Sequence, residues 1–141
     1  MKNYEFIDHT ADIAMKAYGE TVSELFINSA KGLFSLIYTD KPPRTVKMNE
    51  RHIHIKAEII EDLLISWLNE LISIFYTYHF LPESYNIEIK DNNEKTIKGI
   101  IKGNYINIDE SKIATEIKSA AYNIRIERNK RGFETTIIFD V

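Results

Sequence analysis

The sequence contains no cysteine among its 141 residues. Disulfides, thiolate zinc sites and cysteine nucleophiles are therefore excluded, and the absence suits a reducing cytoplasm. No apolar run is long enough to span a membrane, and no N-terminal pattern predicts a signal peptide. Glycine-rich phosphate loops, serine elbows and HExxH motifs are missing, as is a general acid and base paired with a nucleophile. Ordinary catalysis has no clear place here, and we expect a cytoplasmic protein that does not bind membranes.

Composition and charge describe an ordinary globular chain. Hydrophobic residues make up 44% of the sequence and charged residues 28%, so we expect one folded domain, 1–141, with its own core. The formal net charge of −3 argues against a domain whose main role is to grip phosphate backbones. Any nucleic acid is therefore expected to be handled through a partner.

Two segments with apolar residues at helical spacing predict two amphipathic helices. The first follows a capping box, Thr21-Val22-Ser23-Glu24, and ends before Asp40; the second runs from near Glu58 to about His79. The polar stretch 103–112 is expected to be irregular, with one helical turn. Alternating apolar and polar residues predict strands over 4–8, 13–18, 51–57, 85–89, 95–102, 115–128 and 133–141. This pattern indicates an α+β fold, with the two helices packed on a mostly antiparallel or mixed β-sheet.

Carboxylates occur at two points where a strand is expected to end. Asp8 and Asp12 flank a short turn that includes His9, whereas Asp140 and the terminal carboxylate of Val141 follow an apolar strand. Hard divalent cations prefer oxygen ligands of this kind, so these carboxylates offer a metal site. The alternative for Asp8 and Asp12 is turn chemistry, in which their side chains satisfy local backbone donors. The alternative for the last strand is that it packs against the core and its end is solvated.

A charged pair falls on the apolar face of the expected strand 115–128. Glu116 and Lys118 share the parity of Ala120 and Tyr122, so we expect them to point toward the core side. Charges on that side are costly unless they are paired or lie at the mouth of a site. An ion pair at the end of the sheet and a functional pair both remain open.

Three further groups have a simpler explanation than a site. His52 and His54 lie two residues apart on an expected exposed strand face, but the sequence provides no third metal ligand near them, so we interpret them as surface residues. Four basic residues around the last hairpin could contact RNA or an acidic partner, although a solvated hairpin is the simpler interpretation: Arg125, Arg128, Lys130 and Arg131. Four residues at the end of the second helix could form a contact patch, although core packing is the default: Tyr76, Tyr78, His79 and Phe80.

Several blocks of the sequence resemble the archease family. The most specific are the first, Phe6-Ile7-Asp8-His9-Thr10-Ala11-Asp12-Ile13, and the last, Ile138-Phe139-Asp140-Val141. Between them, in the family's order, lie Ala17-Tyr18-Gly19, Leu25-Phe26 through Ala30 to Leu33-Phe34, Leu63-Leu64 through Trp67-Leu68-Asn69-Glu70-Leu71, and Glu116-Ile117-Lys118 through Tyr122. The blocks span essentially the whole chain.

The resemblance implies a small cytoplasmic α+β protein that serves an RtcB-type RNA ligase. Such a ligase seals tRNA halves after intron removal, with GTP and manganese, and the family is implied to promote guanylylation of the ligase's active-site histidine and thereby multiple turnover. tRNA would then be met only indirectly, through the ligase. The family's site for a divalent ion (Ca²⁺, Mg²⁺ or Mn²⁺) maps onto Asp12, Asp140 and Val141. Four residues are expected to neighbour that site: Asp8, His9, Glu116 and Lys118.

One position departs from the family pattern. Many archeases follow the Glu-Ile-Lys block with a Thr-Tyr-His run, whereas this chain has Ala121-Tyr122-Asn123. Any contribution of that histidine to the ligase or to the metal is therefore in doubt here. The three expected ligands are not affected.

These observations lead to the hypothesis of a non-enzymatic activator of an RNA ligase, in which the bound ion helps to order metal and GTP in the ligase. An alternative is that the ion only ties down the C-terminus and another surface activates the ligase. Two other classes remain open. One is a metal-dependent phosphohydrolase or nuclease, and the other is a chaperone-like adaptor for RNA-modifying enzymes.

Overall fold

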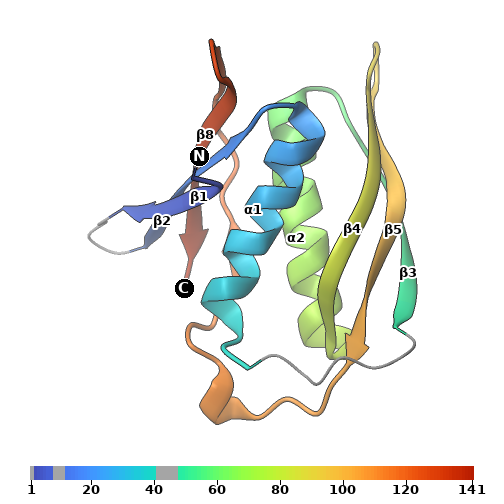
Figure 1. The fold of residues 1–141 in the computed structure, drawn as a ribbon, viewed down its shortest axis with the longest axis vertical. Helices are drawn as coiled ribbons and strands as arrows, with labels where there is room; N and C mark the ends of the chain where they lie inside the picture. Colours follow the sequence, from blue (N-terminus) through green and yellow to red (C-terminus); the bar gives the residue numbers. More distant parts are fainter. Residues whose placement is uncertain (1, 8–11, 41–47) are drawn as a thin grey trace.

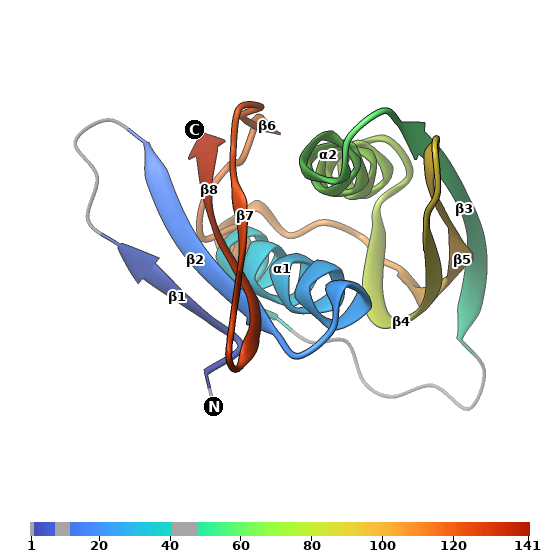
Figure 2. The same ribbon diagram turned by 90° about the horizontal axis from the view of Figure 1, so that it is seen from above.

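Two antiparallel β-sheets enclose a pair of α-helices (Figures 1 and 2). The structure is a computed structural model, and it describes residues 2–7, 12–40 and 48–141. The α+β class, with two helices and antiparallel strands, is confirmed. The expectation of one sheet, antiparallel or mixed, is replaced by two separate sheets that are both antiparallel in every pairing. No helix of the described residues is both long and apolar enough to cross a membrane.

The larger sheet has five strands and carries both ends of the chain. Its order is β1-β2-β8-β6, and β7 also pairs with β8. The strands are β1 (Tyr4–Ile7), β2 (Ile13–Gly19), β6 (Ser119–Ala120), β7 (Ile126–Asn129) and β8 (Gly132–Asp140). Met15, Ala17, Ile137 and Phe139 point into the core and are fully buried, as the alternation of β2 and β8 predicts.

The smaller sheet has three strands in the order β3-β5-β4. The strands are β3 (Asn49–Ala57), β4 (Phe80–Asp91) and β5 (Lys95–Tyr105). Ile53, Ile97 and Ile101 face the helices and are buried, whereas His52 and His54 are exposed on the opposite face. β5 extends to Tyr105 rather than ending at 102, because its pairing with β4 continues to Phe80. Beyond it, a single 3-10 turn covers Glu110–Lys112.

Helix α1 (Val22–Ile37) begins and packs as its sequence predicts. The Thr21 hydroxyl accepts a hydrogen bond of 3.1 Å from the Glu24 amide, which satisfies one of the free donors of the first turn. The predicted apolar stripe lies against the larger sheet, and its central residues are fully buried: Leu25, Phe26, Ser29, Ala30, Leu33 and Ile37.

Helix α2 (Ile60–Tyr78) is buried more completely than an amphipathic pattern implies. It starts two residues later than expected, at Ile60, and ends where His79 adopts a left-handed conformation with φ 55°. Ile65 and Ile74 are buried in addition to the predicted face, because α2 contacts α1, all three strands of the smaller sheet, and β6 of the larger sheet (Figure 2). The Trp67 indole donates a 3.0 Å hydrogen bond to the Phe26 carbonyl and so ties α2 to α1.

The prediction of one long strand over residues 115–128 is wrong. Only β6 and β7 form in this range, and Asn123 between them has a positive φ of 72°. Tyr122, predicted to share the buried face, is 51% exposed.

Polar side chains of α2 replace a neighbouring strand along this segment. The Tyr76 hydroxyl accepts from the Ile117 amide at 3.2 Å, and a Glu61 carboxylate oxygen accepts from the Ile126 amide at 3.3 Å. Between them, the hydroxyl groups of Ser66 and Tyr122 lie 3.2 Å apart in a hydrogen bond. The segment therefore runs antiparallel to α2 and is held by the helix rather than by a continuous sheet.

Candidate functional site: an acidic edge

Asp12 and Asp140 lie at neighbouring positions of two paired strands. β2 and β8 are antiparallel, and their last pair is Ile13 with Phe139. One residue beyond that pair, the register brings Asp12 beside Asp140, and Val141 follows at the end of the sequence. Figure 2 shows the start of β2 and the end of β8 on the same side of the molecule, next to β6. We call Asp12, Asp140 and Val141 the acidic edge.

Strand β6 orients the carboxylate of Asp140. The Ser119 hydroxyl donates to Asp140 Oδ2 at 3.0 Å, and the Lys118 amide donates to the Asp140 carbonyl at 2.8 Å. Asp140 is exposed, Val141 is 46% exposed and Asp12 is half-buried. Asp140 therefore presents to the solvent a carboxylate that Ser119 holds in place.

An amide on α2 holds β6 in place. Asn69 Oδ1 accepts from the Ala120 amide at 2.8 Å, and Asn69 Nδ2 donates to the Ala120 carbonyl at 3.2 Å. One side chain thus satisfies both polar groups of a backbone unit, as a neighbouring strand would. Because Ala120 follows Ser119, Asn69 fixes the strand that contacts Asp140.

The predicted core-facing orientation of Glu116 and Lys118 is wrong. Both side chains are exposed, and Ile117 between them is buried at 1% exposure. The alternation of inward and outward side chains does not apply here, because residues 115–118 do not form a strand. Ile117 is instead anchored by the Tyr76 hydroxyl, whose pKa is raised by its burial. Lys118 nevertheless lies beside the acidic edge, because its amide donates to the Asp140 carbonyl, and Glu116 is two residues before it.

The donors of the acidic edge match a hard divalent ion in chemistry. Two side-chain carboxylates come from adjacent strand ends, with Val141 next to one of them, and such oxygen donors suit Ca²⁺, Mg²⁺ or Mn²⁺. Asp140 keeps Oδ1 available, since Ser119 occupies Oδ2. Within 2–7, 12–40 and 48–141, no three His, Cys, Asp or Glu residues form a cluster for a metal. Asp8 and His9 lie outside the described residues.

The remaining candidates do not converge on this edge. His52 and His54 are exposed on β3, opposite Ile100 and Lys98. The aromatic patch at the end of α2 is divided, because Phe80 is fully buried in β4 whereas Tyr78 is 52% exposed beneath the Arg51 guanidinium.

A comparison with protein-family models matches residues 4–141 to the archease protein family (MTH1598/TM1083). The chain belongs to the archease family. The protein archease of Methanosarcina mazei is 31% identical over 143 residues, which cover 99% of this chain and 97% of that protein.

Two solved structures related to the archease family share the fold. The solution structure of Methanobacterium thermoautotrophicum protein 1598 has a TM-score of 0.82 and 28% identity, and the match covers both chains completely. The crystal structure of an archease from Thermotoga maritima, described as a possible chaperone, has a TM-score of 0.62 and 24% identity over 96% of this chain and 94% of that one.

Ser119 and Asn69 belong to the candidate site but were not predicted from the sequence. Asn69 lies within the Trp67–Leu71 block that resembles the archease family, where the apolar neighbours suggested core packing alone. Its signal was an amide among buried leucines, since a polar group in such a place needs a partner. Ser119 has no comparable signal, because its role depends on the register of β6 against β8.

Proposed function

We propose that this protein is a cytoplasmic accessory protein that activates an RtcB-type RNA ligase and is not itself an enzyme. The observation that carries the proposal is the acidic edge in a chain of the archease family, since Asp12, Asp140 and Val141 are the positions implied for the family's metal site. tRNA meets the protein only through the ligase. The ligase is the partner, and the acidic edge is the part of this protein that acts on it.

An apolar row beside the acidic edge supports docking of the ligase on the outer face of the larger sheet. On that face Ile7 pairs with Ala14, which is only 3% exposed, and Ala14 pairs with the half-buried Ile138. The row continues to Ala121, whose amide donates to the Ile138 carbonyl at 2.9 Å. The helices cover only the other face of this sheet (Figure 2), and Ile7 is 41% exposed. An apolar row next to the acidic edge suits a partner that buries apolar groups beside a cationic site.

Charge is the physical means of activation. Transfer of a nucleotidyl group to a histidine develops negative charge on phosphate oxygens, and catalysis of such steps depends mainly on positioning and electrostatic stabilisation. A divalent ion at the edge would supply positive charge for those oxygens. Asp12 and Asp140 would hold it, Ser119 would fix the rotamer of Asp140, and Asn69 would fix the strand that carries Ser119.

Multiple-turnover ligation by the RtcB-type ligase of the same organism tests this function. We expect the ligase alone to stall after about one turnover, and to continue when this protein is added in substoichiometric amounts, because an activator is released and reused. Joined RNA and the fraction of guanylylated ligase are measured over time, with heat-denatured protein as the control. No stimulation at any ratio would refute the proposed function.

Thermal unfolding tests the ion at the acidic edge. An ion that binds only the folded protein is expected to raise its stability by roughly 1.4 kcal/mol for each tenfold excess over its Kd. The melting temperature should therefore rise with added Mn²⁺, Mg²⁺ or Ca²⁺, and Asp140→Asn should remove most of that rise. An equal rise in wild type and Asp140→Asn would place the ion elsewhere. If the ion raises the melting temperature but has no effect on ligase stimulation, its role is restricted to holding the last residues of β8 in place.

A further inference from the structure

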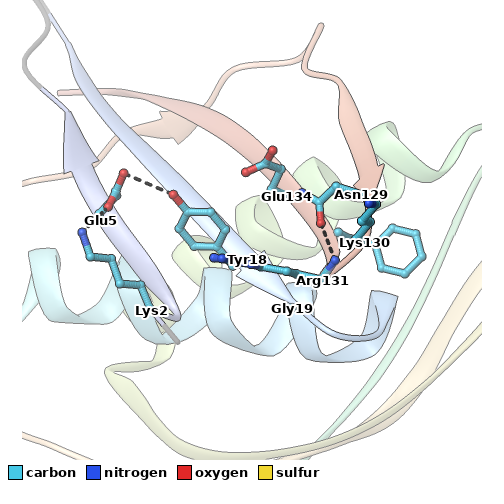
Figure 3. A pocket seen from close by; sticks show the side chains of 9 residues that line it. Lys2, Glu5, Tyr18, Gly19, Asn129, Lys130, Arg131 and Glu134 are labelled. Carbon is cyan, nitrogen blue, oxygen red and sulfur yellow. Dashed lines mark hydrogen bonds and ion pairs between the residues drawn. The ribbon is translucent and has the colours of Figure 1, made fainter.

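A cavity of about 1120 Å³ opens at the end of the larger sheet opposite the acidic edge (Figure 3). The first residues of the chain and β1 form one wall, the end of β2 forms the floor, and the hairpin between β7 and β8 forms the other wall. The volume lies slightly above the range of about 300–1,000 Å³ that is typical of small-molecule sites. Its lining combines cations, two carboxylates and the rings of Tyr18 and Phe133.

Both carboxylates of the cavity are already paired. Glu5 accepts from Lys2 Nζ at 2.9 Å and from the Tyr18 hydroxyl at 3.2 Å, as the dashed contact in Figure 3 shows for Tyr18. These two hydrogen bonds lower the pKa of Glu5, so it stays ionised and neutralises Lys2. Glu134 lies 3.7 Å from Lys16 Nζ. Each carboxylate of the cavity therefore already has a cationic neighbour outside the hairpin.

Two cations of the hairpin have no such partner. Among the residues that the structure describes, no carboxylate lies in an ion pair with Lys130 or Arg131. Asn129 Oδ1 accepts from the Arg131 amide at 2.9 Å, and this contact shapes the turn. In Figure 3 the Arg131 side chain extends from the hairpin toward Tyr18. Positive charge thus lies beside an aromatic ring on the cavity floor.

The hairpin cannot shift away from this position freely. Gly132 has a φ of 133°, a conformation that residues with side chains rarely adopt, and a Cβ there would collide with the Gly19 carbonyl oxygen. The turn is therefore packed directly against the end of β2. Gly132 therefore lets the backbone of the hairpin meet the end of β2 next to Tyr18.

We propose that this cavity binds a nucleoside phosphate, with the phosphate at Lys130 and Arg131 and the base against Tyr18. Two unpaired cations suit a phosphate group, and an aromatic side chain beside them suits the flat face of a base. The local charge differs from the net −3 of the chain, so the site does not depend on a generally basic surface. Free nucleotides and the end of an RNA strand share this chemistry. The site is separate from the acidic edge and does not depend on the proposed function.

NMR titration and calorimetry of the whole protein test the proposal. AMP is expected to shift the backbone amide signals of Tyr18, Gly19 and Gly132. Adenosine alone or inorganic phosphate alone should bind with an affinity at least about tenfold lower than that of AMP. Tyr18→Phe keeps the ring and should keep binding. Tyr18→Leu should weaken AMP binding by roughly tenfold, because a base stacked on an aromatic ring loses that contact.

An adenosine hexanucleotide that binds more tightly than AMP would identify the end of an RNA strand as the natural ligand. Equal binding of the two would identify a free nucleotide.

A matched pair of charge reversals gives the control. Lys130→Glu with Arg131→Glu should abolish AMP binding, whereas Lys90→Glu with Lys98→Glu changes the net charge equally on exposed positions of the smaller sheet and should leave it intact. The absence of any AMP or hexanucleotide binding would overturn the proposal. Equal losses in both double variants would also overturn it, as would a glutamate-rich peptide that competes with AMP at equal affinity.

Discussion

Asp12→Asn is expected to remove stimulation of the ligase while the protein remains folded. The change keeps the size of the side chain and removes one of two side-chain carboxylates from the acidic edge. Losing a charged ligand lowers the affinity for a divalent ion by more than roughly tenfold, since changes even to outer-shell partners cost about 10- to 100-fold. The rate of multiple-turnover ligation at a fixed ion concentration measures the effect, and circular dichroism confirms the fold.

Glu88→Gln provides the matched control for Asp12→Asn. Glu88 is exposed on β4 in the smaller sheet, and its conversion to an amide changes the net charge by the same amount. Stimulation should persist in this variant. If Asp12→Asn stimulates as well as wild type, the ligase can remain the partner, but the acidic edge must be assigned to the scaffold. If both variants fail equally, overall charge rather than the edge governs the interaction.

The elements that could be predicted from the sequence are those defined by local chemistry. Thr21 caps α1 through its own hydroxyl, and this contact depends only on residues three apart. The alternation of β2 and β8 depends only on which side chains are apolar, and it correctly placed Met15 and Phe139 in the core. The pairing of Asp12 with Asp140 follows once these two strands are neighbours. The family resemblance indicated that convergence, whereas the residues alone left turn chemistry as an alternative.

The segment 115–128 could not be predicted because its hydrogen-bond partners on α2 lie 41 to 65 residues away in the sequence. A strand neighbour would have continued the parity of Ala120 through Tyr122, but α2 supplies the hydrogen bonds instead and allows the positive φ of Asn123. The orientation predicted for the Glu116 and Lys118 side chains was wrong for the same reason, because it assumed strand alternation. The burial of Ile65 could not be predicted either, because an amphipathic pattern does not reveal that α2 packs against α1, the smaller sheet and β6 together.

Asn69→Ala is expected to destabilise the protein and to impair ligase stimulation together. The change removes both hydrogen bonds to Ala120 and leaves a partly buried amide and carbonyl without partners, which costs about 1–3 kcal/mol. Urea unfolding measures the loss of stability. Hydrogen exchange at the Ala120 amide should accelerate more than exchange in α1, because β6 has only a short pairing with β8.

Two further variants separate the hydrogen bonds of Asn69 from its bulk. Asn69→Asp keeps the acceptor for the Ala120 amide but turns a carboxylate oxygen toward the Ala120 carbonyl, so stability and stimulation should fall below those of wild type although the size of the side chain is kept. Asn86→Ala, at an exposed position of β4, removes the same side chain from the surface and should change neither. Normal stimulation by a folded Asn69→Ala with a rapidly exchanging Ala120 amide would mean that β6 need not be ordered for Asp140 to act. Impaired stimulation that tracks exchange at Ala120 across the three variants would instead establish Asn69 as a positioning residue, because a loss of global stability alone would not follow that single amide.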